Sequence, residues 1–372
     1  MRFVFLLLVL ASSLPARNWY VRMDGGTAEQ CNGKADAPYR AGGGKNCAFS
    51  NPFYLWTNDP PQSRPYEKPE WKIAGGDTVV LKNGDYRMGF KKPDASGWWN
   101  YLGCRGNNHN CSNPPIPAGT AGNPTRIVGE NWSTGCAVKP VLRGVGGVSA
   151  VLNLQNTSYV DVDCVEFTDA AQCRLVTLKG EPHGCVNYQT DHAYWAIQTN
   201  GNTSHVTLRN LYIHGMAGAG MSGNIGGAIT AEYVYMRGDG NFGWNFDPGA
   251  QAPSKGPLTI RHMVVEWSAC VERYPVADPA IVGCYDQAGA NANGDALGFV
   301  DLDGDITIDH AIIRYNQQDG LDALYVKSGR VLSVTNSQFY GNNGQQVKTG
   351  GSSQTIIRNN LIIGNCERQR EG

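Results

Sequence analysis

Three aspartates and one lysine in the C-terminal third of the chain are spaced so that they could act together. Asp295 lies 24 residues before Asp319, and Asp322 lies 26 residues before Lys348. In a solenoid of that repeat length the four side chains would converge on one face, within one or two strand spacings of ~4.8 Å. Clustered carboxylates repel unless a cation lies among them, and outside the cell Ca²⁺ is the usual cation for oxygen ligands.

No single aspartate of this group predicts a site. Asp-Gly pairs recur in the coils that follow Asp295, and such pairs commonly form the turns that a β-rich solenoid needs. The prediction of a site therefore depends on the alignment of three carboxylates with one amine. That alignment requires a regular repeat.

A repeated pattern of alternating apolar and polar residues supplies that repeat. Asn or His often occupies its fifth position, and Gly or an aromatic residue stands near its end. Period-two alternation indicates half-buried strands. From the second segment onward the starts advance by 23, 29, 48, 26 and 23 residues, which indicates a coil of about 22 to 26 residues with one long insertion. The seven segments begin at Val160, Val206, Ile229, Leu258, Ile306, Leu332 and Thr355.

These repeats predict an all-β fold, a right-handed parallel β-helix. Each coil would hold two or three short strands joined by turns rich in Asn and in the chain's 47 glycines. A β-sandwich is the alternative, but antiparallel hairpins would not require Asn at one phase of every repeat. We expect Asn210, Asn336 and Asn359 to stack as an internal amide ladder.

The N-terminus has the features of a secretory leader. Residues 1–16 contain one Arg, an apolar run from Phe3 to Leu10 and a small-residue segment that predicts cleavage near Ala16. The run is too short to span a bilayer, and no later segment is long and apolar enough. The mature chain is therefore expected to be secreted, either extracellular or periplasmic, without a membrane span.

Eleven cysteines also indicate an oxidising compartment. No Cys or His spacing resembles a zinc site, and Cys366 is the candidate for the unpaired thiol. Spacing alone leaves the connectivity open. Close pairs that could staple loops are Cys31 with Cys47, Cys104 with Cys111, Cys164 with Cys173, and Cys270 with Cys284.

The charges nearly cancel, with 31 basic and 32 acidic residues. This balance argues against nucleic acid as a partner. A monomer is expected, although no feature of the sequence sets the oligomeric state.

The solenoid is predicted to occupy most of the chain. Residues 17–70 form an N-terminal lead-in that covers its open end, and residues 71–366 form the β-helix domain, with loop insertions at 97–124 and 268–293. No recognisable cap precedes Gly372, which is consistent with a C-terminally truncated fragment.

Residues 293–351 resemble the core of family nine polysaccharide lyases, which are β-helix pectate lyases. In that family an Asn-x-Asp-Gly-Phe type segment, a later Asp-Asp-Gly-x-Asp segment and a final Gly-Phe-Lys-x-Gly-Gly segment supply calcium ligands and a lysine base. The corresponding segments here are 293–299 (NGDALGF), 318–322 (QDGLD) and 346–351 (QVKTGG). The resemblance implies a pectate-lyase-like solenoid.

The resemblance also implies the roles of the clustered residues. Asp295, Asp319 and Asp322 would bind Ca²⁺, with Gln318 beside them, and Lys348 would be the base. The implied substrate is an acidic polysaccharide that contains uronic acid, cleaved by β-elimination. The Ca²⁺ would neutralise the sugar carboxylate so that the proton at C5 can leave, and the lysine must be neutral to take it.

The chain departs from the family pattern at three positions. Gln318 stands where the family has the first of two adjacent aspartates, which removes one negative charge and predicts weaker calcium binding. Ala296 replaces a Gly, and Val347 replaces an aromatic residue beside the lysine. These departures leave open whether the substrate or the activity has changed.

Two other functions stay open. A glycoside hydrolase on the same fold would use Asp319 and Asp322 as paired carboxylates, but it gives Lys348 no role. A non-catalytic carbohydrate-binding or surface β-helix would need neither metal nor base. Among the remaining polar and aromatic residues, structural roles are favoured over site roles for Asp239, Asp247, Asp286, Trp98, Trp99, Trp244, His214, His262 and His310.

Overall fold

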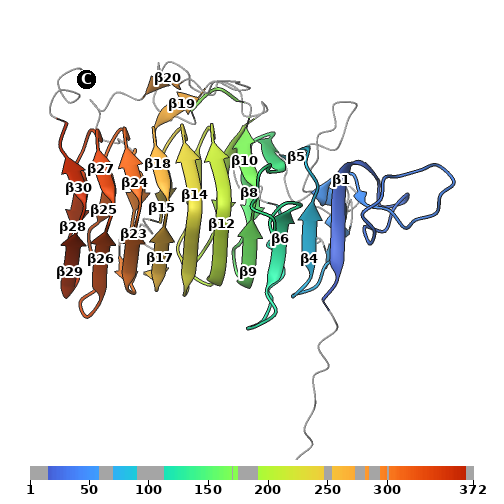
Figure 1. The fold of residues 1–372 in the computed structure, drawn as a ribbon, viewed down its shortest axis with the longest axis horizontal. Coiled ribbons are helices and arrows are strands. Elements are labelled where there is room, and N and C mark those ends of the chain that lie inside the picture. Colours follow the sequence, from blue (N-terminus) through green and yellow to red (C-terminus); the bar gives the residue numbers. More distant parts are fainter. Residues whose placement is uncertain are drawn as a thin grey trace, which may run out of the picture.

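The chain folds as a solenoid of parallel strands. The computed structural model describes residues 16–57, 70–89, 113–169, 171–174, 192–246, 254–272, 281–284, 294–299 and 301–365. Figure 1 shows successive coils stacked side by side along the longest axis, from blue near the N-terminus to red near the C-terminus. Within these ranges the only helix is the four-residue 3-10 helix η1 (Pro52–Leu55). The predicted all-β parallel β-helix is confirmed.

The coils contribute strands to three faces, and most of the described coils contribute to all three. The first face holds β1 (Asn18–Gly26), β4 (Thr78–Leu81), β6 (Thr125–Gly129), β9 (Ser158–Asp163), the first halves of β12 (Ser204–His214) and β14 (Ile229–Arg237), β17 (Leu258–Arg261), β23 (Ile306–Asp309), β26 (Val331–Thr335) and β29 (Gln354–Arg358). The second face holds β5 (Asp85–Gly89), β7 (Val141–Val145), β10 (Glu166–Asp169), the second halves of β12 and β14, β18 (Val264–Glu266), β24 (Ile312–Arg314), β27 (Gln338–Tyr340) and β30 (Leu361–Ile363).

The third face is a separate seven-stranded sheet. It consists of β8 (Val148–Asn153), β11 (Ala193–Gln198), β13 (Ala219–Ser222), β15 (Trp244–Asn245), β21 (Leu297–Gly298), β25 (Leu321–Ala323) and β28 (Val347–Thr349). Outside the three faces lie three short pairs: β2 (Trp56–Thr57) with β3 (Glu70–Trp71), β16 (Ser254–Lys255) with β22 (Leu302–Asp303), and β19 (Cys270–Glu272) with β20 (Ile281–Cys284).

The observed register matches the predicted repeat. The seven predicted starts, from Val160 to Thr355, are consecutive pairing partners on the first face. Two residues further along the first six of these strands, a column of aliphatic side chains points inward and is fully buried, and each Val, Leu or Ile in it stabilises the fold by roughly 1.5–3 kcal/mol. The column includes Val162, Leu208, Ile260, Ile308 and Val334.

The recurring Asn or His marks a sharp corner between the first and second faces. Asn210, His262, His310, Asn336 and Asn359 all have a positive φ, between 49° and 57°. This left-handed backbone disfavours most residues, and Asn tolerates it best after glycine. The Gly or aromatic residue at the end of the repeat marks a second left-handed corner, since Gly215, Gly238, Trp267, Tyr315 and Gly341 have φ between 59° and 67°.

The prediction of an internal ladder through Asn210, Asn336 and Asn359 is therefore wrong. Asn336 and Asn359 are exposed at the corner, where the Asn359 amide donates to Asn336 Oδ1 at 2.6 Å. Asn210 lies three intervening coils away and donates instead to Asp163 at 2.8 Å. These residues recur because of their backbone conformation, which requires no interior amide.

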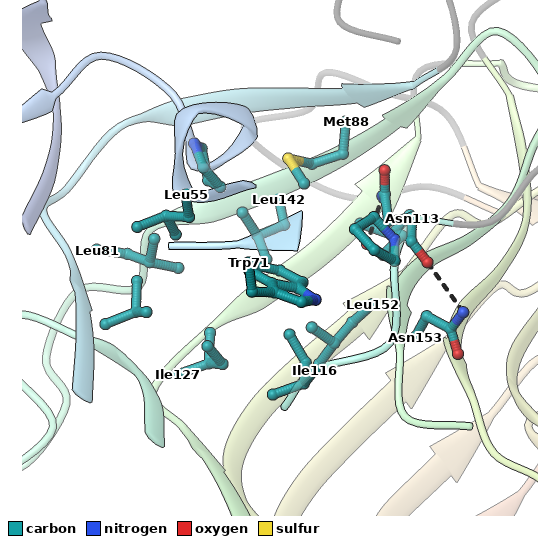
Figure 2. A pocket seen from close by; sticks show the side chains of 14 residues that line it. Leu55, Trp71, Leu81, Met88, Asn113, Ile116, Ile127, Leu142, Leu152 and Asn153 are labelled. Atoms are coloured by element: carbon teal, nitrogen blue, oxygen red, sulfur yellow. Dashed lines mark hydrogen bonds between the residues drawn. The ribbon is translucent and has the colours of Figure 1, made fainter. Parts of the chain in front are cut away.

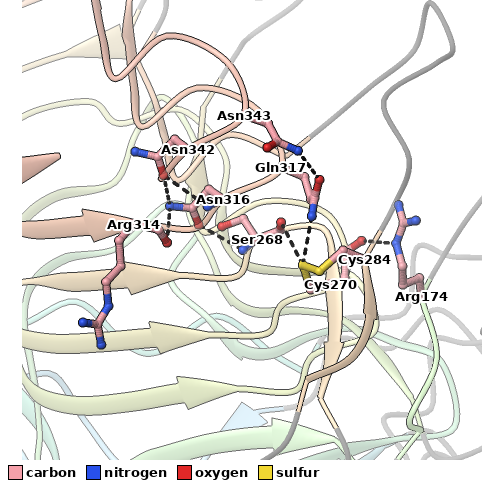
Figure 3. Close-up of a disulfide and its surroundings, with 10 residues drawn as sticks. Arg174, Ser268, Cys270, Cys284, Arg314, Asn316, Gln317, Asn342 and Asn343 are labelled. Atoms are coloured by element: carbon pink, nitrogen blue, oxygen red, sulfur yellow. Dashed lines mark hydrogen bonds between the residues drawn. A yellow bond between two sulfur atoms is a disulfide. The ribbon is translucent and has the colours of Figure 1, made fainter. Parts of the chain in front are cut away.

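An internal ladder exists one residue after the second corner. The buried Asn316 amide donates to Asn342 Oδ1 at 2.8 Å, and Asn316 Oδ1 accepts the Ser268 N–H at 2.9 Å. Figure 3 shows these side chains stacked beside the Cys270–Cys284 disulfide. The ladder provides hydrogen-bond partners for buried backbone groups at the turns that lead to the third face.

The N-terminal segment contributes a strand to the solenoid. Strand β1 pairs in parallel with β4, so the described solenoid extends one rung before residue 71, the predicted start of the β-helix domain. Behind it, Leu55 and Trp71 close the interior, and Figure 2 shows them facing Leu81 and Leu142 across a cavity of about 30 Å³. Its lining is almost wholly apolar, which suits a packing defect rather than a polar ligand site.

Three disulfides lie in the described residues. The predicted Cys31–Cys47 and Cys270–Cys284 bridges are present. The predicted Cys164–Cys173 pair is wrong, because Cys164 bonds Cys136. Strand β6 pairs with β9, so the loop after β6 lies beside the corner that carries Cys164. Coil stacking, and not distance along the chain, selects the partner.

Other cysteine predictions fall on parts of the chain for which the structure describes nothing. These are the pair Cys104 and Cys111, and the thiol of Cys366. In the described ranges no helix has the length and hydropathy to cross a membrane.

Candidate functional site

The third face places Asp322 beside Lys348. In the β25–β28 pair these two residues are register partners, as are Gly298 and Asp322 in the β21–β25 pair. Leu321, next to Asp322, is fully buried. Because neighbouring residues of a strand point to opposite sides, Asp322 and Lys348 lie on the outer side of the face.

Asp319 and Asp295 stack in the turns just before those strands. Asp319 is 2% exposed, and its Oδ1 accepts the Gln345 N–H at 2.7 Å. Asp295 Oδ1 in turn accepts the Asp319 N–H at 3.0 Å. Each carboxylate thus receives an N–H from the next coil, and the 24-residue spacing corresponds to one turn of the solenoid.

The lysine amine joins the two later carboxylates. Lys348 Nζ lies 2.8 Å from Asp322 Oδ2 and 3.3 Å from Asp319 Oδ2. The Lys348 side chain remains 31% exposed, so the amine is reachable from solvent. The structure therefore brings together Asp295, Asp319, Asp322 and Lys348 in one cluster.

Gln318 belongs to the same stack through its backbone. Its N–H donates to Gly294 O at 3.2 Å, and its carbonyl accepts the Gly344 N–H at 3.0 Å. The residue is half-buried between the Asp295 coil and the Lys348 coil. A neutral amide therefore stands next to the buried Asp319 carboxyl.

Burial and charge shift the pKa values within the cluster. Burial, and after it the neighbouring Asp319 charge, raises the pKa of Asp295 to about 7, against a smaller lowering by the bond from the Asp319 N–H. Burial also raises the pKa of Asp319. Burial lowers the pKa of Lys348, but the hydrogen bond to Asp322 and the two carboxylate charges outweigh burial and raise it above its usual value. In this arrangement the amine is an ammonium at neutral pH.

The cluster is built as ion pairs rather than as a closed metal cage. In the described part of the chain, no three or more His, Cys, Asp or Glu side chains are arranged to hold a metal ion. The Asp319 and Asp322 carboxylates point at the Lys348 amine, and Asp322 Oδ1 accepts the Leu324 N–H at 3.2 Å. The donor types still suit Ca²⁺, because carboxylate and amide oxygens are its ligands and three carboxylates face only one ammonium.

Asn245 extends the cluster by two rungs. It pairs in register with Gly298, so Asn245, Gly298, Asp322 and Lys348 form one outward column on the third face. A Cβ on Gly298 would lie 3.0 Å from the Asn245 amide, so the glycine makes room for that amide. The long insertion between Asn245 and Asp295 hides this alignment in the sequence.

Two further candidate residues from the sequence, Asp239 and Trp244, are buried. Asp239 is 1% exposed, and its Oδ1 accepts the Met216 N–H at 3.3 Å. Trp244 is buried against Phe246 and Phe299. Asp247, Asp286, Trp98 and Trp99 lie outside the described residues.

His214 is a buried ion-pair centre on the second face. Its Nδ1 lies 2.7 Å from Glu272 and its Nε2 lies 3.1 Å from Glu166. Burial lowers its pKa, but the bonds to the two carboxylates outweigh burial and raise the pKa to about 9. Because Glu272 belongs to β19, this pair ties the β19–β20 hairpin to the solenoid.

These features define the chain as a parallel β-helix with a polar cluster on its third face. Among solved structures it is similar to pectate lyase Pel9A, with 13% identity, a TM-score of 0.44 and coverage of 94% of this chain and 80% of that one. It is also similar to a rhamnogalacturonan lyase, with 11% identity, a TM-score of 0.42 and coverage of 87% and 74%.

A third similar structure is GH136 lacto-N-biosidase from Eubacterium ramulus, with 10% identity, a TM-score of 0.32 and coverage of 93% and 68%. No family model and no curated protein matches the chain. Likeness at these levels concerns the fold, and a fold shared by such proteins does not choose a reaction.

Proposed function

We propose that this chain is a secreted polysaccharide lyase that cleaves an acidic, uronic-acid-containing polysaccharide by β-elimination, with Lys348 as the base. The observation that carries the proposal is the contact of the partly exposed Lys348 amine with the Asp319 and Asp322 carboxylates. A hydrolase would need the carboxylates but would give the amine no task. Three disulfides support an oxidising compartment.

In this proposal the chain's own residues position the base. Asp322 and Asp319 orient the Lys348 amine on the outer side of the third face, and Asp295 holds the turn that carries Asp319. Because Asp319 and Asp322 raise the pKa of the amine, only its neutral fraction takes the proton from C5 of the uronic acid, and that fraction grows as the pH rises. The electron pair of the C5–H bond forms the C4–C5 double bond as the C4–O bond breaks. A water protonates the departing oxygen, and an unsaturated sugar remains.

We further propose that Asp295, Asp319, Asp322 and Gln318 hold Ca²⁺. The excess of carboxylates over ammonium, with the pKa of Asp295 raised to about 7, supports a place for additional positive charge. When bound, Ca²⁺ would neutralise the substrate carboxylate.

One experiment tests the reaction. The purified chain is incubated with polygalacturonate and with alginate, with Ca²⁺ or with a chelator, and the ultraviolet absorbance of unsaturated uronates is followed. We expect calcium-dependent absorbance that Lys348→Ala abolishes and Lys327→Ala retains. Lys327 is a matched control, because it is an exposed lysine that pairs with Asp301 outside the cluster.

The other outcomes identify the alternatives. New reducing ends without absorbance would indicate a hydrolase. Binding of the polymer without any product would indicate a carbohydrate-binding protein. Absorbance that survives Lys348→Ala would remove the lysine from the mechanism.

A further inference from the structure

A groove crosses the first face, away from Lys348. It lies on the outer side of β6, β9, β12 and β14 and consists of two adjoining hollows of about 320 Å³ and about 160 Å³. Asp161 and Thr207 line both hollows. Three strand spacings separate β14 from the coil of Lys348, or ~14 Å along the solenoid axis, and the Lys348 cluster lies on the third face, so the two sites are distinct.

The charged groups in this groove pair with each other, and carboxylates are in excess. Arg126 lies 3.4 Å from Asp161. Arg209 lies 3.3 Å from Glu232 and 3.8 Å from Asp163. The site therefore offers guanidinium donors and carboxylate acceptors, with two guanidiniums among three carboxylates. Sugar hydroxyl groups, which both donate and accept, match such a mixed surface, whereas an acidic sugar would add negative charge where carboxylates already outnumber guanidiniums.

An aromatic side chain lines each hollow of the groove. Trp132 lines the smaller hollow and is 38% exposed. Tyr159 lines the larger hollow and stacks on His205 with ring centroids 4.4 Å apart. Aromatic rings combine a large apolar face with a polar edge, which suits packing against the apolar face of a sugar ring.

A disulfide fixes the loop that carries Trp132. Cys136 bonds Cys164, which directly follows Asp163 at the corner between the first and second faces. The loop is therefore anchored at the edge of the groove. Because the loop that carries Trp132 is already ordered, it loses less conformational entropy when a ligand binds.

We propose that this groove binds a neutral oligosaccharide independently of the Lys348 cluster. Residues 159–163 of β9 line the two hollows in succession and span ~15 Å, a length that fits a short oligosaccharide. The site holds the sugar without cleaving it. Its role does not depend on the proposed lyase activity.

Calorimetric titration of the full chain tests the proposal, with cellotriose, xylotriose and galactotriose as neutral probes and trigalacturonate as the acidic probe. We expect at least one neutral trisaccharide to bind. Trp132→Ala and Asp161→Asn should each weaken that binding about tenfold or more. Trp132→Phe, which keeps a ring, should weaken it less and guards against a loop that fails to fold.

Two control variants test whether trisaccharide binding depends on this groove and not on other parts of the chain. Val138 is exposed on the same loop, so Val138→Ala should leave the affinity unchanged. Lys348→Ala should also leave it unchanged. The proposal is overturned if none of the three neutral probes binds, if Trp132→Ala has no effect, if Lys348→Ala abolishes binding, or if trigalacturonate competes for the Trp132 groove with higher affinity.

Discussion

The amine of Lys348 lies 2.8 Å from the carboxylate of Asp322, its register partner on the neighbouring strand. The two residues are 26 positions apart in sequence and belong to successive coils. Their contact joins the fold to the chemistry of the candidate site, because the carboxylate decides how readily the amine gives up its proton. Asp319 adds a second, more buried contact to the same amine.

Asp322→Asn should lower the pKa of Lys348. The substitution keeps the shape of the side chain but removes the negative charge and leaves only a weaker, uncharged acceptor, so both contributions of Asp322 to the raised pKa decrease. The amine should then become neutral at a lower pH, and acetylation of Lys348 by a mild amine reagent, followed by mass spectrometry across pH, should show the faster reaction. Lys327 provides the reference amine within each sample. An unchanged pH profile would contradict the assigned contact.

Asp319→Ala should destabilise the fold more than Asp322→Ala. Asp319 is nearly buried, and its loss leaves the Gln345 N–H without its acceptor, which costs about 1–3 kcal/mol. The Asp322 side chain is 14% exposed and its pair with Lys348 is closer to solvent, so ~1 kcal/mol or less is expected. Urea unfolding of both variants measures the difference. Equal losses would show that Asp319 has no special structural role.

Deprotonation of His214 should make the folded protein less stable at alkaline pH. Its folded pKa, raised to about 9, lies above the usual value of 6.5, so the protonated form stabilises the fold. That contribution is fully present below about pH 6.5 and disappears as pH rises through 9. Its size is about 1.4 kcal/mol for each factor of ten by which folding tightens proton binding to the imidazole.

Urea unfolding at both ends of this pH range checks the sign. Wild type should lose more stability on alkalinisation than His214→Gln does. His262→Gln, at an exposed corner, should behave like wild type. A pH dependence that persists in His214→Gln would assign the effect to another group.

Removing the Cys136–Cys164 bridge by replacing both residues with Ala should lower stability by about 3–4 kcal/mol. The bridge closes 28 residues of sequence, and the chain-entropy model gives that loss for a loop of this length. Thermal or urea unfolding measures it. The variant should also bind the neutral trisaccharide more weakly, since Trp132 would lose its anchored loop. Full stability without the bridge would show that coil stacking alone holds the loop.

The repeat was predictable because its signals are local. Alternation identifies strands, and equal spacing identifies coils, so the seven segment starts from Val160 to Thr355 are in register as expected. The same spacing brought Asp295, Asp319, Asp322 and Lys348 together.

The remaining features depend on which side of the backbone a residue faces. A recurring Asn is consistent both with an interior amide ladder and with an exterior left-handed corner, and only the backbone conformation at Asn336 separates them. The alignment of Asn245 with the cluster could not be predicted, because a long insertion interrupts the regular spacing of the coils. The partner of Cys164 required knowledge of which loops lie beside each corner. Whether Gln318 weakens calcium binding stays a prediction.

The two left-handed corners have a consequence for how such a chain can change its length. Each coil bends where its own backbone dictates, at residues such as His310 and Tyr315, and pairs with its neighbours through main-chain bonds. A whole coil is therefore a unit that duplication or deletion can add or remove without disturbing the alignment of the others. Insertion or deletion of a gene segment that encodes one coil would therefore preserve the fold of the other coils. Each such event between the Trp132 groove and the Lys348 cluster would change the distance between the two sites by ~4.8 Å.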